Sequence, residues 1–307
     1  MALVLVSHPD CRKHEMGQGH PECPNRLVLI EQMLKKYFPP SDQIIYKEGR
    51  HAHRDEILLC HHPDHIELLT KRLPSPGSYA EIDSDTKLNA YTLQAAEAAV
   101  GSVIVAVDDV LENPNHRAFC YVRPPGHHAE RHRAMGFCFY NNVAIGAYYA
   151  LEKKGLKRVA IVDFDVHHGN GTEDLVCDDK RILFLSSFQD PFYPHMPYSS
   201  IHPRIVNIPL EAGMESDHFR ELTGRVWFDA LRKFSPEMIF FSAGFDGHVF
   251  DLLGQIDLRE DDFFWITQNV VQIAQEVCQG RVVSVLEGGY HMTALASSVK
   301  AHLNGLL

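Results

Sequence analysis

The residues best suited to chemistry in this sequence are a carboxylate and an imidazole two positions apart. Asp165 and His167 come at the end of an apolar run that predicts a strand over 159–164. In an extended segment, side chains two residues apart point to the same side. Both groups can therefore converge on one point, and their chemistry suits a borderline divalent ion, with zinc the leading candidate.

A third ligand for such an ion is available at the end of another predicted strand. Asp246 follows the apolar run 238–242 and the short segment Ala243-Gly244-Phe245. Two carboxylates and one imidazole leave a coordination position open, which is typical of catalytic zinc and not of structural zinc. The sequence therefore predicts a catalytic metal centre rather than a stabilising one.

A pair of histidines supplies groups for proton transfer. His127 and His128 follow a predicted strand over 118–122. An imidazole titrates near neutral pH, so adjacent histidines can act as general base and general acid. Asp163 lies two residues before Asp165, on the same side of its strand, and can orient one of the two imidazoles.

The segment Glu287-Gly288-Gly289-Tyr290 follows a fourth predicted strand, over 282–286. Two glycines let the backbone approach a ligand closely, and the hydroxyl of Tyr290 can donate a hydrogen bond to a developing oxyanion. Taken singly, each of these features has a plainer interpretation, since an aspartate after a strand more often caps a helix. The coincidence of compatible groups at four strand ends favours a functional site.

The elements that would position these groups are indicated by β-branched apolar runs that alternate with helical patterns along the chain. Such runs suit strands buried on both faces of a parallel sheet, and the alternation predicts a single α/β domain over 1–307. Ligands of open α/β sheets bind outside the carboxyl ends of the strands. The predicted strands are 3–7, 118–122, 159–164, 182–186, 205–208, 238–242 and 282–286, and the predicted helices are 25–37, 89–111, 142–153, 216–233, 259–279 and 292–303.

Composition excludes some classes of function. The chain has 29 basic and 40 acidic residues, for a net charge of −11, which argues against nonspecific nucleic-acid binding and is compatible with a cationic substrate. No apolar run approaches the roughly 18 residues of a membrane span. Seven scattered cysteines without a Cys-x-x-Cys pair indicate reduced thiols and a cytoplasmic location.

A histidine-rich stretch is interpreted as surface and helix start, not as a metal site; it comprises His51, His53, His61, His62 and His65.

With these motifs in place, the sequence resembles the arginase–deacetylase superfamily, and specifically histone deacetylases of the class II type with their bacterial amidohydrolase relatives. The resemblance covers nearly the whole chain. It is carried by the segments 19–27 (Gly-His-Pro-Glu-Cys-Pro-Asn-Arg-Leu), 123–128 (Arg-Pro-Pro-Gly-His-His), 135–142 (Met-Gly-Phe-Cys-Phe-Tyr-Asn-Asn) and 287–290. It implies one α/β domain around an eight-stranded parallel sheet flanked by helices, the arginase–deacetylase fold.

The resemblance also implies roles for individual residues. Zinc would be held by Asp165, His167 and Asp246. His128 would activate the attacking water and later protonate the leaving amine, backed by Asn170, where other branches of the family carry Asp. His127 would be the electrostatic partner, backed by Asp163, and Tyr290 would polarise the carbonyl and stabilise the oxyanion. No position of this catalytic set is missing.

Around this centre, the resemblance implies a narrow channel for the acyl-lysine stem, with Gly136, Phe137, Tyr193, Leu253 and Gly288 as its lining. Tyr193 stands where Phe is usual, and Phe192 and Pro194 flank it. Arg26 would line an acetate exit. A structural potassium ion would lie at Asp163, Asp165, His167 and Ser186, and Phe188 departs from the common His outside the catalytic set.

The leading hypothesis is a zinc-dependent deacylase of acetyl-lysine or a related acyl-lysine in proteins or peptides. The second is an acetylpolyamine amidohydrolase, with the same chemistry on a small acylated amine. Leu253 favours the first, because the polyamine-selective branch carries Glu there and a cationic chain would want a carboxylate. A non-catalytic protein that binds acylated amines is a third alternative, which the complete catalytic set disfavours. A manganese-dependent, arginase-like ureohydrolase is disfavoured because that branch needs more Asp and His ligands for two metals, and the segment 163–170 lacks the extra carboxylates.

Overall fold

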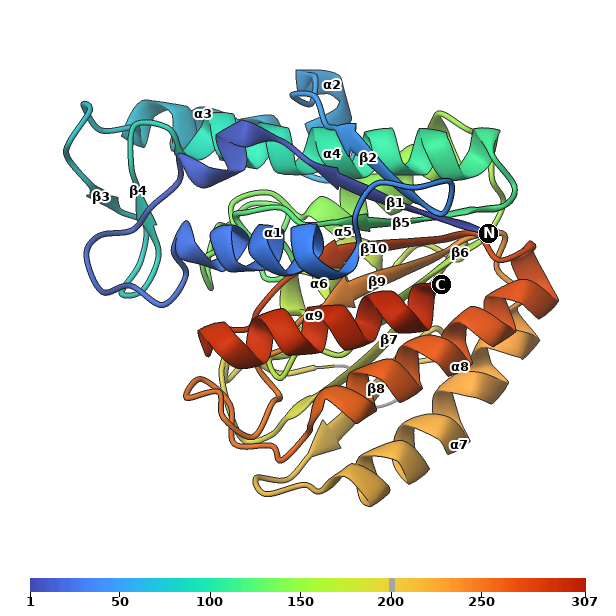
Figure 1. The fold of residues 1–307 in the computed structure, drawn as a ribbon. Coiled ribbons are helices and arrows are strands. Elements are labelled where there is room, and N and C mark those ends of the chain that lie inside the picture. The colour runs from blue at the N-terminus through green and yellow to red at the C-terminus, as the bar shows by residue number, and fades with distance from the viewer. Residues whose placement is uncertain (199–201) are drawn as a thin grey trace.

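Eight parallel strands form the central sheet of the computed structural model, which describes residues 1–198 and 202–307 (Figure 1). The sheet order is β2-β1-β5-β10-β9-β6-β7-β8, so β5, β10, β9 and β6 are neighbours at its centre. Most of these strands are buried along their length, as expected of a parallel sheet covered on both faces. Their bounds are β1 Ala2–Ser7, β2 Ile44–Glu48, β5 His116–Cys120, β6 Val159–Asp163, β7 Ile182–Gln189, β8 Ile205–Leu210, β9 Ile239–Ala243 and β10 Val282–Leu286.

Helices cover the two faces of the sheet in two layers (Figure 1). One layer contains α4 and α5, which pack against β1, β5, β10, β6 and β9, and α6 continues it beside β7; the other contains α1, α9, α8 and α7. This arrangement confirms the single α/β domain with an eight-stranded parallel sheet. The helix bounds are α1 Asn25–Tyr37, α2 Arg54–Ile57, α3 Pro63–Arg72, α4 Thr92–Glu112, α5 Asn142–Glu152, α6 Asn170–Val176, α7 Ser216–Phe234, α8 Glu260–Cys278 and α9 Met292–Leu306, with a 3-10 turn at Pro9–Arg12.

All seven predicted strands are present, but the predictions missed β2. This strand lies at the sheet edge, and its sequence Ile-Ile-Tyr-Lys-Glu is largely exposed after Ile44, so it lacks the apolar run that marks a buried strand. The small hairpin of β3 (Ala80–Glu81) and β4 (Lys87–Leu88) was missed as well, because each of its strands is only two residues long. β5 lies two residues earlier than predicted.

The histidine-rich stretch is partly buried, contrary to its interpretation as surface. His53 and His62 occupy the N-caps of α2 and α3, as a helix start requires. His61 and His65 are only 2% exposed; His61 accepts a hydrogen bond from the amide of Asn141, and His65 contacts the carbonyl oxygen of Phe139. Both therefore support the loop that leads into α5.

Among the described ranges 1–198 and 202–307, no helix is both long and apolar enough to cross a membrane.

Candidate active site

The predicted site residues meet at the carboxyl ends of the four central strands. His127 and His128 follow β5, and Asp165 and His167 follow β6. Asp246 follows β9, and Tyr290 follows β10. Because β5, β10, β9 and β6 are adjacent in the sheet, segments that are more than a hundred residues apart in sequence are brought together.

Asp165, His167 and Asp246 form a compact cluster of potential metal ligands. Each offers one ligand atom, and the three atoms lie within 4.8 Å of one another. The Nδ1 atom of His167 lies 3.1 Å from both Asp165 Oδ1 and Asp246 Oδ2. The other carboxylate oxygens accept backbone hydrogen bonds, from the amide of Gly288 to Asp165 and from the amide of Val166 to Asp246. The outer oxygens are thus fixed by the backbone, while the inner atoms face one another.

The electrostatics of this cluster favour a divalent cation. Burial and the neighbouring Asp165 carboxylate raise the pKa of Asp246 to about 7. Burial alone would lower the pKa of His167, but the carboxylates of Asp246 and Asp165 raise it to about 10. Two buried carboxylates side by side disfavour a second negative charge, and a bound cation would offset both charges. The donor set, one imidazole and two carboxylates, fits zinc.

Glycines allow the strand ends to approach the ligands this closely. A Cβ atom on Gly288 would overlap the carboxylates of Asp246 and Asp165, and one on Gly244 would overlap Asp165. Gly288 was predicted to line the channel. The structure instead places it against the two carboxylates, with its amide donating to Asp165 at 2.9 Å.

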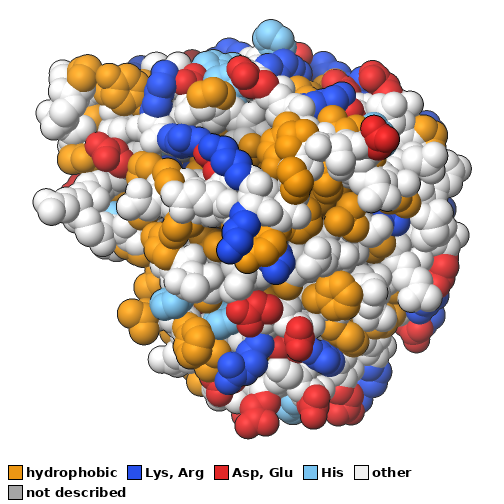
Figure 2. Space-filling view, in the orientation of Figure 1, with side chains coloured by type: hydrophobic (Ala, Val, Ile, Leu, Met, Phe, Trp, Pro, Cys, Tyr) orange, Lys and Arg blue, Asp and Glu red, His pale blue; other side chains and the backbone are white. Residues whose placement is uncertain are grey.

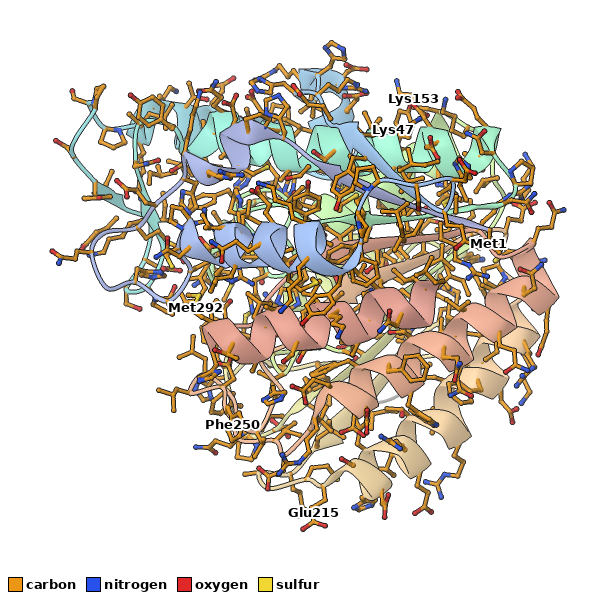
Figure 3. The ribbon with its side chains drawn as sticks, in the orientation of Figure 1. Met1, Lys47, Lys153, Glu215, Phe250 and Met292 are labelled. Carbon is orange, nitrogen blue, oxygen red and sulfur yellow. The ribbon has the colours of Figure 1, made fainter. Side chains whose placement is uncertain are left out.

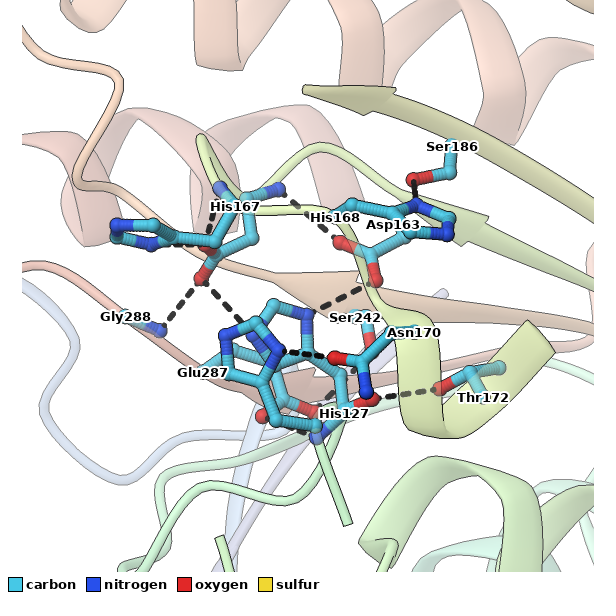
Figure 4. A network of polar contacts seen from close by, with 12 residues as sticks. His127, Asp163, His167, His168, Asn170, Thr172, Ser186, Ser242, Glu287 and Gly288 are labelled. Carbon is cyan, nitrogen blue, oxygen red and sulfur yellow. Dashed lines mark hydrogen bonds and ion pairs between the residues drawn. The ribbon is translucent and has the colours of Figure 1, made fainter. Parts of the chain in front are cut away.

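His127 and His128 lie side by side with different partners, and Figure 4 shows His127 beside Asp163. Their ring centroids are 4.0 Å apart. His127 Nδ1 lies 3.0 Å from Asp163 Oδ2, and His128 Nδ1 lies 2.8 Å from Asn170 Oδ1. Asn170 Oδ1 can only accept, so His128 donates from Nδ1, and its Nε2 is left free to accept a proton.

The two imidazoles also differ in basicity. Burial alone would lower the pKa of His127, but the carboxylates of Asp165 and Asp163 raise it to about 10. The pKa of His128 lies well below the usual value, because it is buried and faces the positive charges of His127 and His167. His127 is therefore suited to hold a positive charge, and His128 to act as a neutral base.

Two further carboxylates support this pair and were not assigned roles from the sequence. Glu287 Oε2 accepts hydrogen bonds from the amides of Gly126 and His127, and its other oxygen accepts from Ser242. Glu287 was visible in the motif 287–290. Glu130 Oε1 accepts from Asn170 Nδ2 at 2.8 Å. In the sequence, Glu130 is marked only by its position two residues after His128, and that position does not reveal its contact with Asn170.

Arg26, in the first turn of α1, contacts the segment that carries Tyr290. Its Nε donates to the carbonyl oxygen of Gly289 at 2.8 Å, and its Nη2 donates to that of Glu287. The guanidinium carbon lies 4.9 Å from the ring centroid of Tyr290. Arg26 is fully buried and pairs with Glu22, 3.1 Å away, a carboxylate that it shares with Arg123. This position behind Tyr290 is compatible with the predicted exit route.

A cavity of about 310 Å³ leads to the metal-ligand cluster. Of the predicted channel residues, Gly136, Phe137, Tyr193 and Leu253 line it, and Gly288 does not. The ring of Phe192 stacks on His167, with centroids 5.6 Å apart. The remaining lining is His128, His167, Tyr290, Phe192 and two residues that were not predicted, Asp85 and Leu252.

Residues of the expected potassium site lie together beneath the cluster. Asp163 pairs in register with Ser186 across β6 and β7. Asp163 Oδ1 accepts from the amide of Asp165, and Ser186 Oγ lies 3.4 Å from His168 Nδ1. Phe188 packs on the His168 ring at 4.3 Å. His167 and Asp165, also expected at this site, contact each other through His167 Nδ1 and Asp165 Oδ1, 3.1 Å apart, and His167 Nδ1 lies equally close to Asp246 Oδ2.

A second group of possible ligands, His8, Asp10 and His51, lies outside the active site. Lys13 Nζ already lies 2.6 Å from Asp10 Oδ1, and Gln94 donates to Asp10 Oδ2. A cationic side chain therefore neutralises this carboxylate.

Three comparisons with known proteins bear on this site. A family profile described as the histone deacetylase domain matches residues 20–306. The chain is 38% identical to an uncharacterized protein, slr0245, of Synechocystis over 99% of both chains. It is 32% identical to the polyamine deacetylase HDAC10 of Mus musculus, over 100% of this chain and 48% of that protein. The crystal structure of the HDA15 HD domain is similar with a TM-score of 0.90 at 29% identity, covering 99% of this chain and 89% of that chain.

Proposed function

The chain belongs to the histone deacetylase family, whose members are hydrolases of amide bonds, and on that premise we propose that it is a zinc-dependent deacylase of acetyl-lysine or a related acyl-lysine in proteins or peptides. The observation that carries this proposal is the cavity of about 310 Å³ that joins His128, His167 and Tyr290 in one lining. The base, a metal ligand and the oxyanion donor thus face the same space.

Asp165, His167 and Asp246 would hold the metal. A zinc ion bound there would supply Lewis acidity, lowering the pKa of a water molecule and polarising the substrate carbonyl. The chain's own contribution is to hold three ligand atoms within 4.8 Å of one another and to leave one side of the cluster open to the cavity.

His128 would move the proton. As a neutral base of low pKa, it would take a proton at Nε2 from the attacking water while Asn170 holds its Nδ1. The water oxygen bonds to the amide carbon, and the carbon–nitrogen bond then breaks. His128 would return the proton to the leaving amine, and the carboxylic acid formed then loses its own proton to that amine, giving a carboxylate and a lysine ammonium group. His127, paired with Asp163, would stay positive and stabilise the negative charge that develops.

Tyr290 would stabilise the oxyanion. Burial raises the pKa of its hydroxyl well above the usual value, so the hydroxyl stays protonated and can donate a hydrogen bond. Arg26 holds the backbone on either side of Gly288 and would accept the released acetate on its way out. Asp163 and Ser186 would take part in binding a structural potassium ion.

The apolar lining supports acyl-lysine as the substrate. Phe137, Tyr193 and Leu253 line the cavity and suit the methylene stem of lysine. An acetylpolyamine amidohydrolase is the second candidate, favoured by the 32% identity to a polyamine deacetylase. Leu253 argues against it, since it offers no carboxylate to a cationic chain. The seven free cysteines support a reducing, cytoplasmic compartment.

A variant at Tyr290 tests this mechanism. Tyr290→Phe removes only the hydroxyl, so we expect kcat on an acetyl-lysine peptide to fall by about a hundredfold or more, by analogy with the loss of one oxyanion donor. Zinc content, measured by atomic emission, should stay at the wild-type level. Full activity in this variant would show that Tyr290 is not the oxyanion donor.

A further inference from the structure

Two exposed apolar side chains stand in one loop beside the channel. Of the large hydrophobic residues in the described part of the chain, Leu252 is the most exposed, at 93%, and Phe250 follows at 58%. Both lie in the loop 248–254, between β9 and α8. Apolar side chains that are held in water next to a binding cavity commonly mark a contact surface. The proposed reaction gives the exposed side chains of Phe250 and Leu252 no role.

The loop that carries them is held in place by a network of hydrogen bonds. Asp251, buried between Phe250 and Leu252, accepts from the amides of Tyr290, His291 and Leu253. Other backbone bonds close the loop, from the Val249 amide to Leu258 and from the Asp251 amide to His248. Because the loop is fixed, a partner that binds to the two exposed side chains loses little free energy to ordering them.

The two side chains continue the wall of the channel outward. Leu253 and Leu252 both line the cavity, and the Phe250 ring lies 5.8 Å from the ring of His291, the residue after Tyr290. In Figure 3, Phe250 lies at the lower left, below Met292, the first residue of α9. In Figure 2, hydrophobic and histidine side chains lie together on this lower left edge. The same lining includes the carboxylate of Asp85.

We propose that Phe250 and Leu252 form an apolar rim that binds an apolar side chain next to the acyl-lysine of a peptide substrate. This inference rests on the proposed deacylase function and specifies its substrate class. When the acyl-lysine occupies the channel, the flanking residue on one side lies against this rim. An acetylpolyamine has no such side chain, so the rim acts only on peptides and proteins.

The expected effect is a preference of about tenfold in kcat/KM. Removing roughly 60 Å² of apolar surface from water, a modest contact between two leucine side chains, corresponds to about 1.4 kcal/mol, which is a factor of ten. The preference should appear for leucine on one side of the acyl-lysine and not on the other, because Phe250 and Leu252 stand in one loop between β9 and α8 and can contact only one of the two flanking residues.

The test uses three peptides with one acetyl-lysine, flanked by glycine on both sides, by leucine before it, or by leucine after it. Wild-type protein should hydrolyse one leucine peptide about tenfold faster than the glycine peptide in kcat/KM. The double variant Phe250→Ser/Leu252→Ser should bring this ratio to within twofold of one. Leu68→Ser is the matched control: Leu68 is an exposed leucine on α3, 44% exposed, and this change should leave the ratio at about ten.

The outcomes separate the rim from the deacylase function. Equal rates on the three peptides, or a leucine preference that survives in the double variant, would overturn the rim while leaving the deacylase function intact. Failure of zinc-loaded wild type to hydrolyse any of the peptides would overturn both. A change in elution volume on size exclusion in the double variant, and not in Leu68→Ser, would show that the rim joins two copies of the chain and would replace our proposal.

Discussion

Asn170 separates His128, the proposed base, from the carboxylate of Glu130. Replacing the Asn170 amide by a carboxylate should change the pH dependence of activity. Asn170 Oδ1 accepts from His128 Nδ1 at 2.8 Å, and Asn170 Nδ2 donates to Glu130 Oε1 at 2.8 Å. The amide thus shields His128 from direct contact with a negative charge. Burial and the charges of His127 and His167 keep the pKa of His128 low.

The perturbation is Asn170→Asp combined with Glu130→Gln. Asp alone would place two carboxylates in contact, and one of them would then take up a proton. With Gln at position 130, a single carboxylate faces His128, and the Gln amide donates to its other oxygen. An opposite charge in direct contact favours the charged imidazole and raises its pKa by about 1–3 units. A base works only when it is unprotonated, so the acidic limb of activity should move to higher pH by about 1–3 units.

The assay is kcat/KM on an acetyl-lysine peptide from pH 5 to pH 9, with zinc content measured for each variant. Glu130→Gln alone is the control: it removes the charge beyond Asn170 and keeps an acceptor for its amide, so the acidic limb should stay in place or move to lower pH. An acidic limb that does not move in the double variant, at full zinc content, would refute the assignment of His128 as the base held by Asn170.

Other changes have equally direct expectations. Asp246→Asn removes one anionic ligand and the charge that a cation offsets, so zinc content after dialysis should fall below about a tenth of wild type, and unchanged content would exclude Asp246 as a ligand. Leu253→Glu places a carboxylate in the cavity lining; the ratio of kcat/KM for N-acetylputrescine over an acetyl-lysine peptide should rise by about tenfold or more, and a ratio that stays constant would show that Leu253 does not set selectivity. Asp251→Ala leaves the amides of Tyr290, His291 and Leu253 without their acceptor. It should lower the free energy of unfolding by about 2–4 kcal/mol, as expected for loss of hydrogen bonds to a buried charged group, and chemical denaturation that shows no change would contradict this role.

The ligand cluster and the sheet were predictable because they depend on local patterns. Asp165 and Asp246 each follow a strand that is apolar on both faces, and parallel strands bring their carboxyl ends to one edge. β2 was not predictable in this way. As an edge strand it needs no apolar run, and only its pairing with β1 reveals it.

Contacts over long sequence separations account for what was missed in the site. Glu130 matters through Asn170, forty residues away, and Asp251 through Tyr290, thirty-nine residues away. Neither contact leaves a periodicity or spacing in the sequence. Gly288 was assigned to the channel, but its missing side chain makes room for the carboxylates of Asp165 and Asp246, and a need for space around a ligand becomes visible only in three dimensions.

The most direct test of the central claim is a parallel assay of zinc-loaded protein on an acetyl-lysine peptide and on N-acetylputrescine, with and without a hydroxamate chelator. The account predicts faster turnover of the peptide, abolished by the hydroxamate. Faster turnover of acetylputrescine would keep the chemistry and contradict acyl-lysine as the substrate. No turnover of either compound by fully zinc-loaded protein would contradict the proposed deacylase itself.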